Sequence, residues 1–239
     1  MNNEDKNEYW IGGIHCVNAA FKNKNRKIYE IIFLDPKRIK NFSNTNIILN
    51  KKDANFFYKI FDKNFAHQGI AARVSKLPSY DLDNELKKNF INKFIILNQI
   101  TDPRNLGSII RSALAFGYGN IIIDKRIYNE KSYTLIKASS GAVESVKIFQ
   151  SSNIKNEIKK LKKNNFWIYG LDSNAITDIA KVKLEKKVGF VFGSEEKGIE
   201  HNIKKNCDYL IKINISNIDS LNVSNAVSAT LAIANYKNY

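Results

Sequence analysis

The stretch that decides the fold lies at residues 210–239, which read LIKINISNIDSLNVSNAVSATLAIANYKNY. Ile211, Ile213 and Ile215 alternate with polar residues, and this period of two predicts a half-buried strand. From residue 221 onward, apolar residues recur at helical spacing around nearly the whole circumference, which predicts a buried helix. The polar side chains of that helix gather at its N-terminal end. They can bind a polar ligand there, although helix caps are the more common reason for such a cluster.

The composition permits a polyanionic partner without requiring one. The 239 residues suffice for one large or two modest domains. Lys and Arg number 38 against 23 Asp and Glu, and this net charge of +15 suits RNA or an anionic membrane surface. Only six of the cations are Arg, however, and a chain rich in Lys, Asn and Ile together is also what A/T-rich codons produce. The few arginines are therefore more informative than the many lysines.

Several classes of protein are disfavoured by the sequence. Cys16 and Cys207 are too few and too far apart for a disulfide framework, and the three His show no metal-ligand spacing, so we expect no metal and a reducing, cytoplasmic setting. The polar first nine residues are unlike a signal peptide, and no apolar run is long enough to span a bilayer. We also find no P-loop and no Ser/His/Asp set.

The pattern of elements predicts two α/β domains. Residues 1–75 alternate helices and strands in a compact unit, and residues 76–92, with lower apolar density and a run of acids, read as a linker. Residues 93–239 then alternate strand and helix, which predicts a mostly parallel sheet with helices on both faces. Ligands of such sheets bind beyond the carboxyl ends of the strands.

An aromatic row marks the helix expected over residues 52–65 in the first domain. Phe57, Phe61 and Phe65 recur at every fourth position and so share one helix face. The row could stack on bases, but a row of this kind more often belongs to a core.

Three loops of the second domain each follow a predicted strand, so we expect them to gather at one edge of the sheet. In the first loop, Asp102 and Pro103 are typical of a helix entrance. Arg104 and Arg111 then lie on one face of the helix, either as a phosphate- or carboxylate-binding pair or as a solvated, salt-bridged stripe.

The second loop contains a glycine and two acids, and the third is the polar break before the terminal helix. Gly193 ends a buried strand, where the backbone could approach a ligand closely. Glu195 and Glu196 follow, and such acids are often ordinary first-turn residues. The residues alone therefore indicate a ligand-binding edge but no reaction.

Taken together in this order, the three loops resemble the three motifs of the SpoU (TrmH-like) family of 2′-O-ribose RNA methyltransferases in the SPOUT superfamily. A further segment resembles a family segment between the first two motifs. Two N-terminal segments resemble the substrate-binding domain of the bacterial 23S rRNA guanosine-2′-O subgroup. The matching segments are DPRNLG at 102–107 with Arg111, GSEEKG at 193–198, SLNVS at 220–224, KASSGA at 137–142 with Glu144, GIHCV at 13–17 and HQGI at 67–70.

This resemblance implies a fold, a cofactor and a partner. The C-terminal part of the second domain would form a deep trefoil knot, although topology rules make knots a rare exception. An S-adenosylmethionine site would lie there, with Gly193, Ile213 and Leu221 lining the adenosine pocket. The first domain would bind RNA, with 23S rRNA as the expected substrate, and the protein would be a homodimer.

The resemblance also implies catalytic residues, and the matching positions are Asn105, Arg111, Glu195 and Asn222. The reaction would be an in-line attack of a ribose 2′-oxygen on a sulfonium methyl group. Arg111 is sometimes cast in this family as the base. A guanidinium stays protonated at neutral pH, so we favour a clamp on the adjacent phosphate that also steadies the forming alkoxide.

Departures from the family pattern keep two alternatives open. Asn214 stands where a proline is usual, Glu196 where a glycine is common, and Asn225 where a small or apolar residue is usual. The loop before the third motif is also one residue shorter. The alternatives are the same chemistry on tRNA and an RNA-binding homologue that has lost catalysis.

Overall fold

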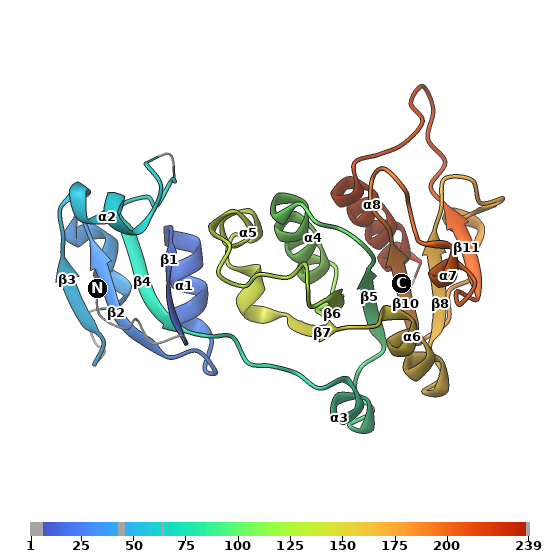
Figure 1. Ribbon diagram of the computed structural model, residues 1–239, viewed down its shortest axis with the longest axis horizontal. Coiled ribbons are helices and arrows are strands. Elements are labelled where there is room, and N and C mark those ends of the chain that lie inside the picture. The colour runs from blue at the N-terminus through green and yellow to red at the C-terminus, as the bar shows by residue number, and fades with distance from the viewer. Residues whose placement is uncertain (1–6, 43–45, 64, 238–239) are drawn as a thin grey trace. The chain divides into compact units, whose positions relative to one another are not determined.

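The computed structural model describes residues 7–42, 46–63 and 65–237 (Figure 1). Two expectations lie partly outside these ranges, namely the polar N-terminal lead and the helix expected over residues 52–65. Within the described ranges, no helix is both long and apolar enough to cross a membrane.

The chain divides into two compact units. The first combines residues 1–78 with residues 129–145, and the second combines residues 79–128 with residues 146–239. The sequence had indicated that residues 129–145 belong to the second domain, and their packing shows why they group with the first unit. A Cβ built on Gly141 would lie only 2.6 Å from the Cβ of Ala19, so this segment presses directly on the N-terminal helix.

The second unit is built on a seven-stranded sheet in the order β7-β6-β5-β10-β8-β11-β9, and all of its pairings are parallel. This confirms the expected parallel α/β fold. The central strands β5 and β10 read KFIIL and VGFVF, apolar runs that suit strands covered on both faces. The strands are β5 (Lys93–Leu97), β6 (Asn120–Asp124), β7 (Lys147–Ser151), β8 (Trp167–Leu171), β9 (Thr177–Asp178), β10 (Val188–Phe192) and β11 (Tyr209–Lys212).

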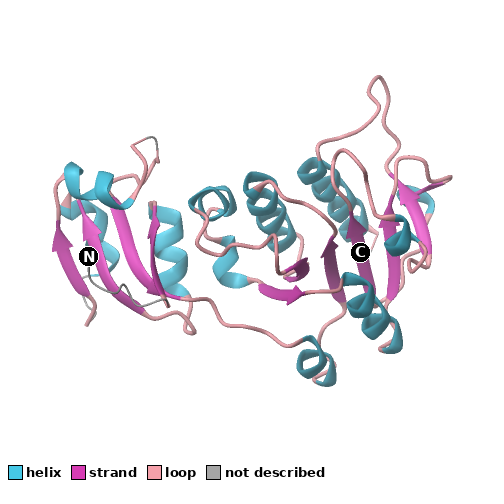
Figure 2. Cartoon of the chain, viewed as in Figure 1, coloured by secondary structure: helices cyan, strands magenta, loops and turns pink. Residues whose placement is uncertain are grey.

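Helices cover both faces of this sheet (Figures 1 and 2). Apolar residues of α3, α6 and α7 form one core with alternating residues of the strands. On the other face α4 and α8 pack against one another. The region expected to be a linker contains α3, because Leu82 and Leu86 are buried in the first of these cores. The helices are α3 (Leu82–Lys87), α4 (Pro103–Ala115), α6 (Ile154–Lys163), α7 (His201–Lys204) and α8 (Val223–Tyr236).

The terminal strand is shorter than its alternation predicts. β11 ends at Lys212, so the strand prediction is wrong for Ile213 and Ile215. Only three residues of β11 pair with β8 and two with β9, which leaves the following residues without a ladder. Those residues instead line a cavity described below. The buried terminal helix is confirmed as α8, with Val227 and Leu231 fully buried.

The first unit is a smaller α/β unit with the sheet order β1-β4-β2-β3. Phe57 of α2 and Phe61, which caps its C-terminal end, pack against Ile32 and Ala71 of the sheet, so the aromatic row belongs to a core. The sequence pattern did not indicate β1, which pairs antiparallel with β4. The elements are β1 (Glu8–Gly12), α1 (Ile14–Lys22), β2 (Ile28–Phe33), β3 (Ile48–Lys51), α2 (Ala54–Ile60), β4 (Ile70–Ser75) and α5 (Tyr133–Ser139).

Candidate functional site

Three side chains that the sequence indicated as catalytic meet in one hydrogen-bonded cluster. Glu195 Oε1 accepts from Asn105 Nδ2 at 3.1 Å, from the backbone N–H of Val223 at 3.3 Å and from Asn222 Nδ2. Asn222 Nδ2 also donates to Asn105 Oδ1 at 3.2 Å. The three expected loops therefore come together at the carboxyl edge of the sheet. Glu195 and Asn222 follow Asn105 by 90 and 117 positions in the sequence, yet both contact its side chain.

Helix entrances hold two members of this cluster in place. Asp102 caps α4 by accepting from the backbone N–H of Arg104 at 2.8 Å, which fixes the first turn that carries Asn105. Asn222 is itself the N-cap of α8, and its Oδ1 accepts from the backbone N–H of Ser224 at 3.0 Å. The amide of Asn222 thus has one end in the helix cap and the other on Glu195.

The turn that carries Glu195 depends on a close backbone approach. A Cβ built on Gly193 would lie 2.0 Å from the carbonyl carbon of Gly198, a distance that no side chain tolerates. Ser194 and Gly198 form an isolated antiparallel bridge, with Gly198 N donating to Ser194 O at 2.9 Å. Gly198 has φ +63°, which favours glycine. The GSEEKG segment therefore forms a tight turn.

A first cavity, of about 280 Å³, opens between this turn and the chain around the end of β11. Gly193, Ile213 and Leu221 all line it, so the three residues expected at a cofactor site share one cavity. Asp172, at the end of β8, also lines it and forms an ion pair with Lys204 at 2.6 Å. Burial is the largest single effect on Asp172 and opposes its charge, but the hydrogen bonds from Lys204 and the backbone N–H of Asn174, together with the charge of Lys204, outweigh it, so the pKa of this carboxyl is lowered.

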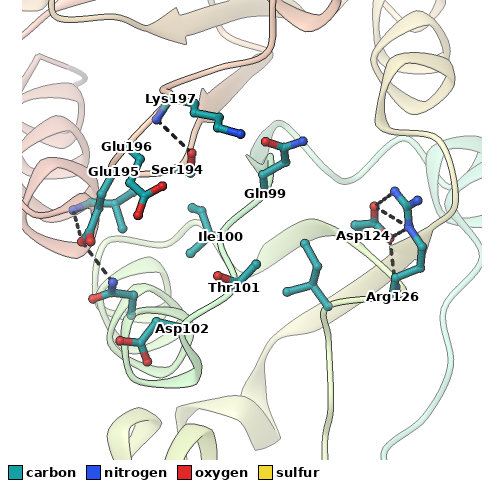
Figure 3. A pocket seen from close by; sticks show the side chains of 13 residues that line it. Gln99, Ile100, Thr101, Asp102, Asp124, Arg126, Ser194, Glu195, Glu196 and Lys197 are labelled. Atoms are coloured by element: carbon teal, nitrogen blue, oxygen red, sulfur yellow. Dashed lines mark hydrogen bonds and ion pairs between the residues drawn. The ribbon is translucent and has the colours of Figure 1, made fainter.

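Figure 3 shows the residues that line a second cavity, of about 430 Å³. Residues 194–197 and Val223 line both cavities and so form a shared wall. Gln99, Asp124 and Arg126 line only the second cavity, and Figure 3 shows Asp124 and Arg126 across from residues 194–197.

The sequence analysis did not indicate Asp124 or Arg126. Arg126 Nε donates to both carboxylate oxygens of Asp124, at 2.9 and 3.1 Å, and Nη2 also contacts Oδ2. The hydrogen bonds from Arg126 lower the pKa of Asp124, against the opposing effect of burial. Asp124 is the last residue of β6, so the rule that placed the other three loops at the carboxyl edge could have found this pair.

The loop after β5 is tied to the start of α7. Asn98 Nδ2 donates to Glu200 Oε2 at 3.0 Å, and Gln99 Nε2 donates to Glu200 Oε1 at 2.6 Å. The backbone of Gln99 has φ +59°, a conformation that residues other than glycine rarely adopt. The hydrogen bonds to Glu200 hold Gln99 in this conformation. The sequence pattern gave no indication of this cross-link, since its partners are about a hundred residues apart.

Arg111, the fourth residue expected to be catalytic, lies six positions after Asn105 on α4. It lies on an exposed face of α4 and is absent from the residues that line the two cavities. Its neighbour Ser112 contacts Ser228 of α8, with 2.8 Å between the hydroxyl oxygens. Arg111 therefore flanks the packed pair of helices whose N-terminal ends carry Asn105 and Asn222.

Comparisons with known proteins agree with this architecture. The family model described as SpoU rRNA Methylase family matches residues 92–232. A TrmH family tRNA/rRNA methyltransferase of Staphylococcus aureus is 35% identical over 178 residues, which cover 70% of this chain and 72% of the relative. A TrmH family tRNA/rRNA methyltransferase of Bacillus subtilis is 36% identical over 151 residues, covering 62% of this chain and 61% of the relative.

Solved structures share the fold over the whole chain. The SpoU methyltransferase AviRb from Streptomyces viridochromogenes, crystallised in complex with the cofactor AdoMet, superposes with a TM-score of 0.84 at 19% identity, covering 100% of this chain and 94% of AviRb. An rRNA methyltransferase from Sinorhizobium meliloti, also bound to AdoMet, gives a TM-score of 0.79 at 19% identity, covering 96% of this chain and 87% of that protein. At these identities the likeness shows the fold. Because the family model spans more than half of the sequence, the chain belongs to the SpoU rRNA methylase family.

Proposed function

We propose that the protein transfers a methyl group from S-adenosylmethionine to the ribose 2′-oxygen of a guanosine in 23S rRNA. One observation carries the proposal: Glu195, hydrogen-bonded to Asn105 and Asn222, lies in the wall shared by two adjacent cavities. A transfer between two bound reactants requires two sites in contact, and this arrangement supplies them. The resemblance of the N-terminal segments to the 23S rRNA guanosine-2′-O subgroup supports the choice of substrate.

The first cavity suits the cofactor. Gly193 contributes only backbone to the wall of this cavity, and the absence of its side chain lets the backbone of Gly198 pack against it. Ile213, Leu221 and Ala226 add apolar surface for an adenosine. S-adenosylmethionine, when bound, supplies a methyl group activated by its sulfonium. The carboxylate of Glu196 also lines this cavity and could pair with a cationic group of the cofactor.

Positioning is the main contribution we assign to the catalytic cluster. Alignment of two bound reactants can supply roughly 7–11 kcal/mol of a reaction barrier. Oε1 of Glu195 already accepts three N–H donors, so Glu195 acts by fixing the amides of Asn105 and Asn222 toward the substrate. Arg111 would clamp an RNA phosphate, for which its exposed place on α4 is suitable.

The assembly expected from the resemblance is part of the same proposal. The protein would be a cytoplasmic homodimer with a trefoil knot in the C-terminal part of the second unit, and the first unit would bind RNA. A dimer would let the site draw residues from both chains. Light scattering of the purified protein tests the dimer directly.

tRNA is the second substrate to consider, because the relatives from Staphylococcus aureus and Bacillus subtilis are both named tRNA/rRNA methyltransferases. The deciding experiment incubates the protein with methyl-labelled S-adenosylmethionine and either a 23S rRNA or a mixed tRNA transcript, and then maps the labelled nucleotide. We expect a single 2′-O-methylguanosine in the rRNA. Label in the tRNA alone would make tRNA the substrate in place of 23S rRNA. Cofactor binding without label in either RNA would favour the non-catalytic homologue.

A further inference from the structure

The inference rests on one wall of the second cavity, which the cofactor cavity lacks. Its lining residues come from the loops after β5, β6 and β10, and one of them is Arg126. The inference rests on the proposed function, because it assigns to this cavity the RNA that accepts the methyl group. It adds a residue outside the three motifs to the machinery of the site.

Arg126 is held so that part of its guanidinium is available to a ligand. Its Nε and Nη2 bind the carboxylate of Asp124, and its backbone N–H donates to the same carboxylate at 2.9 Å. Asp124 is buried at the end of β6, so it forms a fixed anchor. The side chain of Arg126 is 76% exposed, and within the described residues its Nη1 has no hydrogen-bond partner. A guanidinium has five N–H donors, so several face away from Asp124.

Most of the carboxylates in the cavity are held by other groups of the protein. Asp102 caps α4, Asp124 is occupied by Arg126, and Glu195 accepts from Asn105, Asn222 and Val223. Three of the four carboxylates that line the cavity are therefore already engaged, and Glu196 is the fourth. Lys197 adds a second cation to the lining.

The choice of arginine at this position indicates a phosphate. The chain contains 38 Lys and Arg, of which six are Arg, so a cation that only needed charge would most often be Lys. A guanidinium offers a rigid fork that can bind Asp124 on one side and two phosphate oxygens on another, which an ammonium cannot do. A phosphate next to the acceptor ribose brings just such a pair of oxygens.

We propose that the second cavity receives the target nucleotide and that Arg126, positioned by Asp124, binds a phosphate of that nucleotide or of its immediate neighbour. The sugar would then face the shared wall of residues 194–197, beyond which the cofactor cavity lies. Arg126 is a substrate-binding residue in this scheme, and Asp124 is a positioning residue that acts through it.

The test measures the salt dependence of RNA binding. A 23S rRNA transcript and a tRNA transcript are titrated with the wild type and with Arg126→Ala, Arg126→Lys and Asp124→Asn at several KCl concentrations, with S-adenosylhomocysteine present. Lys125→Ala is the matched control, because it removes one positive charge from the adjacent exposed residue, which does not line the cavity. Melting temperatures and S-adenosylmethionine affinities are measured for every variant.

We expect Arg126→Ala to weaken RNA binding about tenfold and to reduce the slope of log K against log salt by about 0.7 to 0.9, the value for one lost phosphate contact. Arg126→Lys should keep most of the slope but bind RNA more weakly, since it retains charge and loses the fork. The RNA affinity of Asp124→Asn should lie between those of Arg126→Ala and Arg126→Lys. Lys125→Ala should match the wild type, and all variants should keep the wild-type affinity for S-adenosylmethionine.

Several results would overturn the inference. An Arg126→Ala protein with the wild-type slope and RNA affinity shows no phosphate contact, and one with impaired S-adenosylmethionine binding places Arg126 on the cofactor instead. A wild type that binds neither transcript removes the cavity as a nucleotide site. If the wild type binds RNA through Arg126 but transfers no methyl group, the proposed function fails while this inference stands.

Discussion

Removal of the carboxylate of Glu144 should strongly destabilise the first unit. Glu144 Oε1 lies 3.4 Å from Arg26 Nε, and Glu144 Oε2 accepts from Asn23 Nδ2 at 2.9 Å. The side chains of Glu144 and Arg26 are only 3% and 1% exposed. Arg26 also donates to the hydroxyl of Tyr9 at 2.7 Å, but that group carries no compensating charge. Glu144→Ala therefore leaves a buried cation without its partner.

The expected loss follows from that burial. A buried ion pair broken by removal of one partner costs about 3–5 kcal/mol, because the remaining charge stays desolvated. In a unit of about 95 residues each kcal/mol corresponds to about 4–8 °C of melting temperature, so the transition of the first unit should fall by roughly 12–40 °C. Replacement of both partners, as in Arg26→Met with Glu144→Leu, removes the uncompensated charge and should recover more than half of the loss.

Tryptophan fluorescence can follow this unit separately. Trp10 belongs to the first unit and Trp167 to the second, and the chain has no other tryptophan. In a Trp167→Phe background, thermal melts of the full chain report on the first unit through Trp10. A Glu144→Ala shift below about 4 °C would refute the reasoning, since that is less than 1 kcal/mol. So would a double variant that melts no higher than the single one.

Three further predictions concern the second unit. Glu195→Ala should lower kcat for RNA methylation about a hundredfold, because the alignment of the reactants is lost, and should leave the KM for S-adenosylmethionine unchanged. Glu195→Gln retains a hydrogen-bond acceptor, so its kcat should fall less. Gly193→Ala should abolish S-adenosylmethionine binding measured by calorimetry, because its Cβ would collide with Gly198. Gly117→Ala, which has φ +77° but no atom within 4 Å of its Cβ, should melt lower and still bind. Hydrogen bonds from Lys147 and Lys88 lower the pKa of Glu85, so its contribution to stability should be lost as the pH falls below the ordinary value of 4.5 and through the lowered pKa, and melts of Glu85→Gln should depend less on pH there.

Local patterns were sufficient for the elements of the second unit because its strands are apolar runs and its helices have clear entrances. β5 and β10 are buried on both faces, so their composition alone marks them as central strands. Asp102 and Pro103 mark the start of α4 in the same way. The motif residues Asn105, Glu195 and Asn222 could be placed at one edge because parallel strands end together.

The features that the sequence did not indicate depend on contacts between distant residues. Glu144 reaches Asn23 across 121 positions, and this contact helps to assign residues 129–145 to the first unit. β11 ends early because its neighbours on the sheet offer few partners, which its own alternation cannot reveal. Arg126 follows a strand by two residues without a glycine or proline to draw attention to it.

The order of the strands explains why one turn can serve two cavities. β5, β6 and β7 follow one another toward one edge of the sheet, whereas β8 and β10 lie on the other side of β5, so the direction of winding reverses between β5 and β10. Ligands of open α/β sheets bind in the crevice at such a reversal, beyond the carboxyl ends of the strands. The second cavity is lined from the loops after β5, β6 and β10, and the first from those after β8, β10 and β11. The turn after β10 is common to both, so a methyl donor on one side and its acceptor on the other would be separated by the shared wall of residues 194–197 and Val223.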